Sequence, residues 1–188
     1  NGYPLVIIQS SVRKYQIINK NMYLYLIRHG IAGDPDPIAV DSISSDELRS
    51  LTKVGRKKVE QVADRLEKLE LKFDLIMTSP LVRARQTAEI LIDKQLSPNL
   101  EVSPELKPSG NLPAWLREWE ASPRNISHLA VVGHEPNLSH WAELLIFGKV
   151  GDRLILKKGG MIGLRFAADR MAIGTAQIWC LMPPKYLI

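Results

Sequence analysis

Five residues suited to binding phosphate stand at three places where apolar segments of the sequence end. Arg28 and His29 follow the first segment, Ser79 and Arg83 follow the second, and His134 follows the third. An arginine guanidinium presents a fork of donors that matches phosphate oxygens, and a helix amino terminus adds backbone N–H groups and partial positive charge. If the fold brings these three places together, they would hold phosphate.

The three apolar segments are typical of buried strands. The first, MYLYLIRHG at 22–30, is rich in aromatic and β-branched residues and stops at a glycine, and similar segments run over 73–78 and 127–132. In open α/β sheets, ligands bind outside the carboxyl ends of the strands. We therefore expect the three strand ends to meet at one crevice.

Helical patterns fill the intervals between these strands. Thr52 is a suitable N-cap for a helix with a 3.6-residue apolar period that ends near Leu71. Ser79 as N-cap and Pro80 as first helical residue predict a helix over 80–93, with Arg83 in its first turn. The remaining expectations are helices over 112–121 and 137–147, strands over 161–167 and 175–182, and loops over 31–50 and around Pro98, Pro104 and Pro108. This order predicts an α/β fold with several parallel strands.

Length and composition indicate one compact domain. The 188 residues are enough to bury one hydrophobic core, and 45% hydrophobic with 24% charged residues is ordinary for a soluble globular protein. Residues 1–21 show no clear period, so we treat them as an N-terminal extension before a domain at 22–188. Cys180 is the only cysteine, which excludes an internal disulfide and a cysteine-based metal site and favours a reducing, cytoplasmic setting.

The charge of the chain is compatible with an acidic partner. A net charge of +5 and basic clusters such as Lys157 and Lys158 could gather anions. No zinc finger, helix-turn-helix or aromatic stacking platform accompanies these clusters, so we expect no nucleic-acid partner. No apolar run approaches the roughly 20 residues of a membrane span, so we expect no membrane partner either. No cluster of His, Asp and Glu has recognisable metal-ligand spacing, and we expect neither a metal nor a cofactor, although the loop carboxylates Asp34, Asp36 and Asp41 could bind a cation weakly.

Each of these features also has a purely structural interpretation. An arginine in a helix usually lies on its surface, and a single histidine near a turn is more often structural than catalytic. We assign His128 and His140 to that structural role, because neither follows a predicted strand. The functional hypothesis therefore depends on the three strand ends taken together.

Four motifs, in this order, resemble the histidine phosphatase superfamily, which has the phosphoglycerate mutase-like fold. They are LIRHG at 26–30, LT at 51–52 followed by Gly55, TSPLVRARQTAE at 78–89 and VVGHEPNLS at 131–139. Within the superfamily, the PEL segment at 104–106 followed by Gly110, and the GHEPNLS form, resemble the SixA-type phosphohistidine phosphatases. The resemblance extends over 22–182, nearly the whole predicted domain.

The resemblance implies a fold and a set of roles. The fold would be a three-layer αβα sandwich with a mostly parallel sheet. His29 would be the nucleophile that becomes phosphohistidine, while Arg28, Arg83 and His134 would grip the phosphoryl oxygens without a metal. Many family members place a carboxylic acid near the phosphate, and Glu105 is the first candidate for this proton donor. Glu135 is the second.

The resemblance leaves three functions open. The stretch between Ser79 and His134 is short, which implies an open site suited to phosphohistidine on another protein, such as a histidine phosphotransfer domain. The alternatives are a phosphatase of small phosphate esters and a non-catalytic phosphoprotein binder. A weak or absent proton donor would favour phosphoramidates over esters, because a protonated imidazole leaves more readily than an alkoxide.

Overall fold

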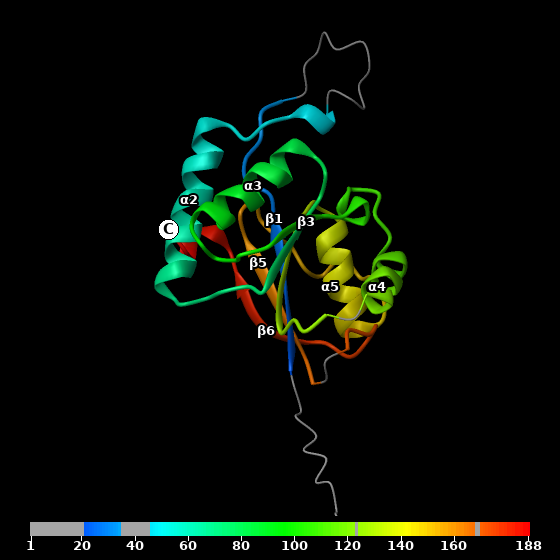
Figure 1. Ribbon diagram of the computed structural model, residues 1–188. Helices are drawn as coiled ribbons and strands as arrows, with labels where there is room; N and C mark the ends of the chain where they lie inside the picture. Colours follow the sequence, from blue (N-terminus) through cyan, green and yellow to red (C-terminus); the bar gives the residue numbers. More distant parts are fainter. Residues whose placement is uncertain (1–20, 35–45, 123, 168–169) are drawn as a thin grey trace, which may run out of the picture.

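A computed structural model of the chain describes residues 21–34, 46–122, 124–167 and 170–188. Within these ranges, one sheet has six strands in the order β3-β2-β4-β1-β5-β6 (Figure 1). The strands are β1 Met22–Arg28, β2 Leu75–Thr78, β3 Leu100–Val102, β4 His128–Gly133, β5 Met161–Phe166 and β6 Gln177–Met182. Neighbours from β3 to β1 pair in parallel, whereas β5 pairs antiparallel with both β1 and β6. The expected α/β fold with a mostly parallel sheet is confirmed.

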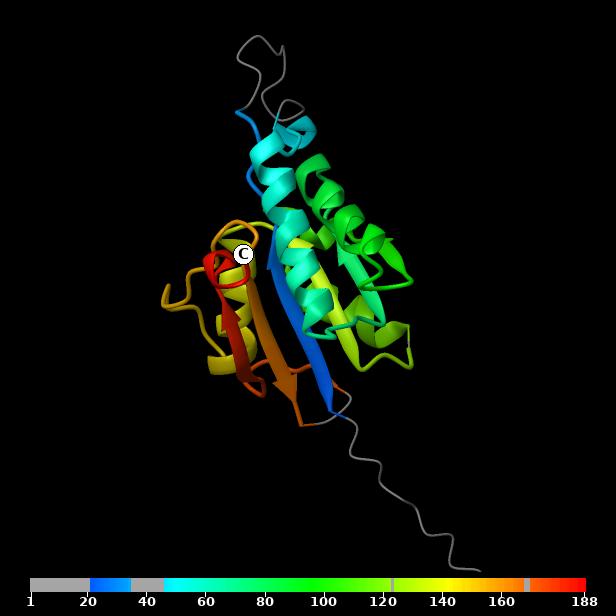
Figure 2. The same ribbon diagram turned by 90° about the vertical axis from the view of Figure 1, so that its left-hand side faces the viewer.

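Helices cover both faces of the sheet and complete three layers (Figures 1 and 2). The helices are α2 Lys53–Lys68, α3 Val82–Asp93, α4 Leu112–Ala121 and α5 Asn137–Phe147. Side chains of α2 and α3 pack with Tyr25 and Ile27 of β1, and those of α4 and α5 pack with Leu24 and Leu26 on the other face. Because successive residues of a strand point to opposite faces, β1 needs apolar residues at almost every position.

Two glycines permit close contacts that fix the loops near the strand ends. A Cβ atom on Gly55 would lie 2.0 Å from the carbonyl oxygen of Ile31. The start of α2 can therefore contact the segment after β1 only if residue 55 is glycine. A Cβ atom on Gly110 would lie 1.6 Å from the carbonyl oxygen of Glu105, which requires glycine after the PEL segment. In both places glycine allows a turn to pack directly against the backbone of a segment that follows a strand.

The structure corrects the predicted start of one helix and the content of one predicted loop. Helix α3 begins at Val82, two residues later than expected, because Ser79 extends the sheet by donating its N–H to Val132. The region 98–108 was expected to be loop, but it contains strand β3 and a short 3₁₀ helix at Pro104–Leu106. Strand β3 has only three residues, all exposed at the sheet edge, and so short a run is too little for periodicity to identify a strand.

The region 31–50, also expected to be loop, carries two described features. Ala32 forms an isolated β-bridge with Leu51, and residues 46–48 form a helical turn. Most of the predicted N-terminal extension at 1–21 lies outside the described residues, as do Asp36 and Asp41. The described part of the chain has no helix that is both long enough and apolar enough to cross a bilayer.

Candidate active site

The three predicted strand ends belong to three adjacent parallel strands, β2, β4 and β1. Beyond the strands, the amide of Ser79 donates to Val132 at 2.9 Å and the amide of His29 donates to Gly133 at 3.1 Å. These bonds hold the residues that follow each strand at a common level. The expected convergence at one edge of the sheet is therefore present.

His29 is buried with one ring nitrogen fixed and the other facing an arginine. Its Nδ1 lies 2.7 Å from the carbonyl oxygen of Gly30, and because a carbonyl oxygen only accepts, this contact places the ring proton on Nδ1. The lone pair is then on Nε2, to which Arg83 Nε donates at 3.3 Å. Burial, together with Arg83, Arg28 and Lys158, lowers the pKa of His29 to about 4. His29 is thus neutral at pH 7 and carries a lone pair toward the cation.

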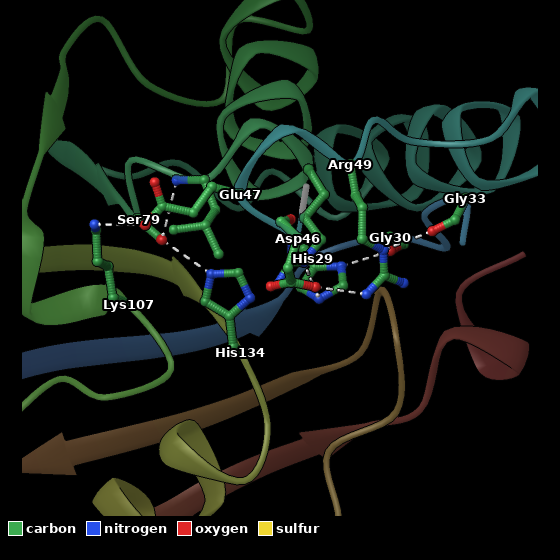
Figure 3. A network of polar contacts seen from close by, with 11 residues as sticks. His29, Gly30, Gly33, Asp46, Glu47, Arg49, Ser79, Lys107 and His134 are labelled. Carbon is green, nitrogen blue, oxygen red and sulfur yellow. Dashed lines mark hydrogen bonds and ion pairs between the residues drawn. The ribbon is translucent and has the colours of Figure 1, made fainter. Parts of the chain in front are cut away.

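Arg83 lies in the first turn of α3, with its side chain only 6% exposed. Its Nη1 donates to the carbonyl oxygen of Asp46 at 2.6 Å, and its Nη2 donates to Asp46 Oδ2 at 3.0 Å. Asp46 also accepts from Arg49 at 2.8 Å, and Figure 3 shows this acidic turn beside His29. Neither Asp46 nor Arg49 was predicted from the sequence. The Asp- and Ser-rich segment around them has no apolar period that would indicate which part of the fold it contacts.

His134 completes the cluster from the end of β4. Its ring centroid lies 5.0 Å from that of His29, and its Nε2 lies 2.9 Å from Ser79 Oγ (Figure 3). Ser79 Oγ accepts from the amide of Leu81 at 3.3 Å, so its own proton is free to point at His134 Nε2. His134 Nδ1 is buried and has no hydrogen-bond partner in the described part of the chain. Burial, with His29 and Arg83, lowers the pKa of His134 to about 3.

Arg28 is the last residue of β1 and directly precedes His29. Its Nη1 donates to the carbonyl oxygen of Leu156 at 2.9 Å, while its Nε is buried without a partner among the described residues. Burial lowers the pKa of Arg28, and the nearby Glu135 carboxylate opposes that shift. Lys158, from a basic cluster noted in the sequence, is close enough to act on His29. The site is therefore cationic and rich in N–H donors.

Neither glutamate considered as a proton donor is hydrogen-bonded to this cluster within the described ranges. Glu105 Oε2 accepts from the amide of Asn111 at 2.7 Å, just before α4. Glu135 accepts from the amide of Ser139 at 3.2 Å and from its hydroxyl, inside the first turn of α5. Both carboxylates thus serve local backbone structure.

The other two histidines have structural partners, as the sequence analysis expected. His128 stacks on Tyr23 with ring centroids 4.8 Å apart and contacts the Tyr25 hydroxyl at 2.9 Å, at the opposite end of β4 from His134. His140 Nε2 lies 2.9 Å from Asp152 on the outside of α5. No cluster of histidine, cysteine and carboxylate side chains suited to a metal ion occurs among the described residues.

Comparisons with known proteins agree with this architecture. Residues 24–108 match the model of the histidine phosphatase superfamily (branch 1). An uncharacterised protein of Picosynechococcus sp. (strain ATCC 27264 / PCC 7002 / PR-6) is 46% identical over 171 residues, covering 89% of this chain and 99% of that protein. The phosphohistidine phosphatase SixA of Escherichia coli (strain K12) is 35% identical over 121 residues, covering 60% of this chain and 71% of that protein.

A solved structure has the same fold. The protein histidine phosphatase SixA complexed with tungstate superimposes with a TM-score of 0.73 at 23% identity, covering 89% of this chain and all of that one. Sequence relatives, motifs and fold lead to the same assignment. The chain belongs to the histidine phosphatase superfamily, where it is a SixA-like hydrolase.

Proposed function

We propose that this protein is a phosphatase that takes a phosphoryl group onto His29 and then transfers it to water. The observation that carries the proposal is the state of the His29 ring. A carbonyl oxygen holds the proton on Nδ1, and the Nε2 lone pair faces the Arg83 guanidinium. A neutral nucleophile next to a cation that can bind its target is the arrangement that phosphoryl transfer to nitrogen needs.

In the first step, His29 Nε2 attacks the phosphorus atom and the bond from phosphorus to the leaving group breaks. The electron pair of that bond departs with the leaving group, and His29 becomes a phosphoimidazolium whose Nδ1–H stays on the Gly30 carbonyl. Arg83 Nε, Arg28 Nε and His134 Nδ1–H donate to the three phosphoryl oxygens. The last two are among the buried side-chain atoms that lack partners within the described residues, which supports this role.

In the second step, water attacks phosphorus from the side that the leaving group has left. A P–O bond forms, the P–Nε2 bond breaks, and His29 returns to the neutral ring with its proton on Nδ1. Both protons of the water leave with the phosphate product. The positive side chains stabilise the charge spread over the phosphoryl oxygens in both steps, so the scheme requires no metal.

For the substrate, we infer phosphohistidine on another protein, such as a histidine phosphotransfer domain. The phosphohistidine phosphatase SixA is one of the chain's relatives, at 35% identity. Neither Glu105 nor Glu135 is hydrogen-bonded to the cluster among the described residues, which supports a substrate whose leaving group needs no added proton. Lys157 and Lys158 are exposed beside the site and could contact an acidic partner. We place this activity in the cytoplasm, which the single free cysteine supports.

The test measures phosphate release from a phosphohistidine-bearing phosphotransfer domain and from p-nitrophenyl phosphate, with His29→Ala as the blank. We expect turnover of both substrates, a higher kcat/KM for the protein substrate, and no turnover by the variant. A preference for the ester would indicate a small-molecule phosphatase. Turnover that survives the substitution would overturn the His29 mechanism, and no turnover of either substrate would favour a phosphoprotein binder.

A further inference from the structure

Asp46 is the carboxylate in closest contact with the phosphate-binding residues in the described part of the chain. It bonds to Arg83 through its carbonyl oxygen and through Oδ2, and Arg83 in turn donates to His29 Nε2. The Asp46 side chain is 40% exposed, whereas that of Arg83 is 6% exposed. The carboxylate therefore lies on the solvent side of the buried guanidinium, one side chain away from the nucleophile.

The leaving group has to depart on that same side. In an in-line displacement, the nucleophile and the leaving group lie on opposite sides of phosphorus. His29 is buried at 6% exposure, so a leaving group attached to a protein must point away from it toward solvent. Asp46 is thus placed to touch the leaving group rather than the phosphoryl oxygens.

Two arginines keep the Asp46 carboxylate ionised and leave it room to accept. Burial raises the pKa of Asp46, but hydrogen bonds from Arg49 and Arg83 outweigh burial and hold that pKa below its ordinary value. Arg49 uses Oδ1 and Arg83 uses Oδ2, so with respect to the described residues each carboxylate oxygen retains a second acceptor position. An ionised carboxylate has no proton to give to an ester oxygen, but it can accept an N–H.

We propose that Asp46 selects the leaving group by accepting a hydrogen bond from the distal ring N–H of a departing imidazole. A phosphohistidine protonated on that distal nitrogen transfers its phosphoryl group to His29 Nε2. The P–N bond of the substrate breaks, a P–N bond to His29 forms, and the substrate leaves as neutral imidazole with its N–H on Asp46. No proton has to reach the leaving atom. This inference rests on the proposed phosphohistidine substrate and deepens it.

The Asp46 carboxylate would disfavour an alkoxide or phenolate leaving group. Negative charge develops on its oxygen, beside a carboxylate that cannot protonate it and that repels it. The same side chain therefore favours phosphoramidates and disfavours esters. A residue that only positioned Arg83 would affect both substrate classes alike, and so would a residue that only competed with phosphate for Arg83.

The experiment compares two substrates in two variants and a matched control. Asp46→Asn removes the charge with little change in shape. Asp46→Ser also removes the carboxylate, so the test can still be made if one of the two variants is unstable. Glu47→Gln is the control, because Glu47 lies in the same turn but pairs with the surface Lys107 at 2.7 Å. We measure kcat/KM for the phosphohistidine-bearing domain and for p-nitrophenyl phosphate.

We expect the Asp46 variants to lose roughly 10- to 100-fold in kcat/KM on phosphohistidine and to keep or gain activity on the ester. Glu47→Gln should leave the ratio of the two values unchanged. An equal loss on both substrates, or an equal gain, would overturn the inference while leaving the His29 mechanism intact. If the unmodified protein does not hydrolyse phosphohistidine, the proposed substrate fails first, and the two failures remain distinguishable.

Discussion

Strand β4 has a histidine at each end, and the two have different surroundings. His128 begins the strand, stacks on Tyr23 and contacts the Tyr25 hydroxyl. His134 follows the strand, lies against His29 with ring centroids 5.0 Å apart, and keeps Nδ1 without a partner in the described residues. The same residue type therefore completes an aromatic cluster at one edge of the sheet and a cationic cluster at the other.

The difference shows which edge of a parallel sheet can hold a ligand site. At the amino ends of the strands, side chains of neighbouring strands meet one another, and Asp74 there accepts the backbone amides of Ser127 and His128. At the carboxyl ends, the chain turns into helices, and these turns bring Arg83 and Ser79 beside the two histidines. Arg28 Nε and His134 Nδ1, two buried atoms without a partner among the described residues, lie at the second edge, as a ligand site requires.

The largest expected difference between the two edges is tested by replacing His134 and His128 in turn. His134→Ala should lower kcat by about 10²- to 10³-fold, because it removes a donor to the phosphoryl oxygens. His128→Ala should change kcat by less than about twofold and lower the free energy of unfolding by about 1–3 kcal/mol, through the lost stacking and hydrogen bond. Steady-state kinetics and chemical denaturation measure both effects. Equal losses of activity in the two variants would contradict the functional difference between the two edges.

A smaller effect on kcat is expected from two buried serines, one at each of these edges. Ser79→Ala should lower kcat by about tenfold, because Ser79 orients the His134 ring and leaves the proton on Nδ1. Ser97→Ala is the matched control, since the hydrogen bonds of Ser97 to other described residues join it to Asn99 in the turn before β3, at the amino edge. The control should alter stability without altering kcat. A fall in kcat for Ser97→Ala as large as that for Ser79→Ala would remove the positioning role.

A further effect is a pH dependence of stability that arises from the carboxyl edge. The folded protein holds the pKa of His29 at about 4 and that of His134 at about 3, whereas an unfolded histidine titrates near 6.5. Below pH 6.5 the unfolded state binds protons that the folded state refuses, so stability falls as pH drops from 6.5 toward 4 and is fully retained above 6.5.

A variant without one of these histidines should show a shallower pH dependence. Denaturant titrations of His134→Gln and of the unmodified protein at several pH values between 4 and 7 provide the measurement. The difference in free energy of unfolding between them should change steadily below pH 6.5 and stay constant above it. A constant difference over the whole range would mean that His134 is protonated equally in the folded and unfolded states.

Much of the site was predictable because its residues follow buried strands. Apolar runs with sharp ends located Arg28, His29, Ser79 and His134, and the strand order then required these ends to lie together. Helices α4 and α5 occur over the predicted residues, since Leu112, Trp115 and Leu116 are buried on one face of α4. Periodic burial is a signal that a sequence carries locally.

The missed features depend on contacts that have no local signal. Asp46 reaches Arg83 across 37 residues of sequence, from a segment without apolar period. Glu105 accepts from the backbone amide of Asn111, a partner that its motif does not reveal. The later start of α3 follows from the bond between Ser79 and Val132, a contact between strands. Charged side chains in loops acquire a role only from what the fold places beside them.

The most direct test of the account is to locate the phosphoryl group during turnover. The protein is mixed with excess phosphohistidine-bearing domain, quenched quickly in alkaline denaturant to preserve phosphohistidine, digested and examined by mass spectrometry. The account predicts one phosphoryl group on His29 and none in His29→Asn. A phosphoryl group on another residue of the protein, or continued turnover of the unmodified protein with none trapped on His29 at any quench time, would contradict it.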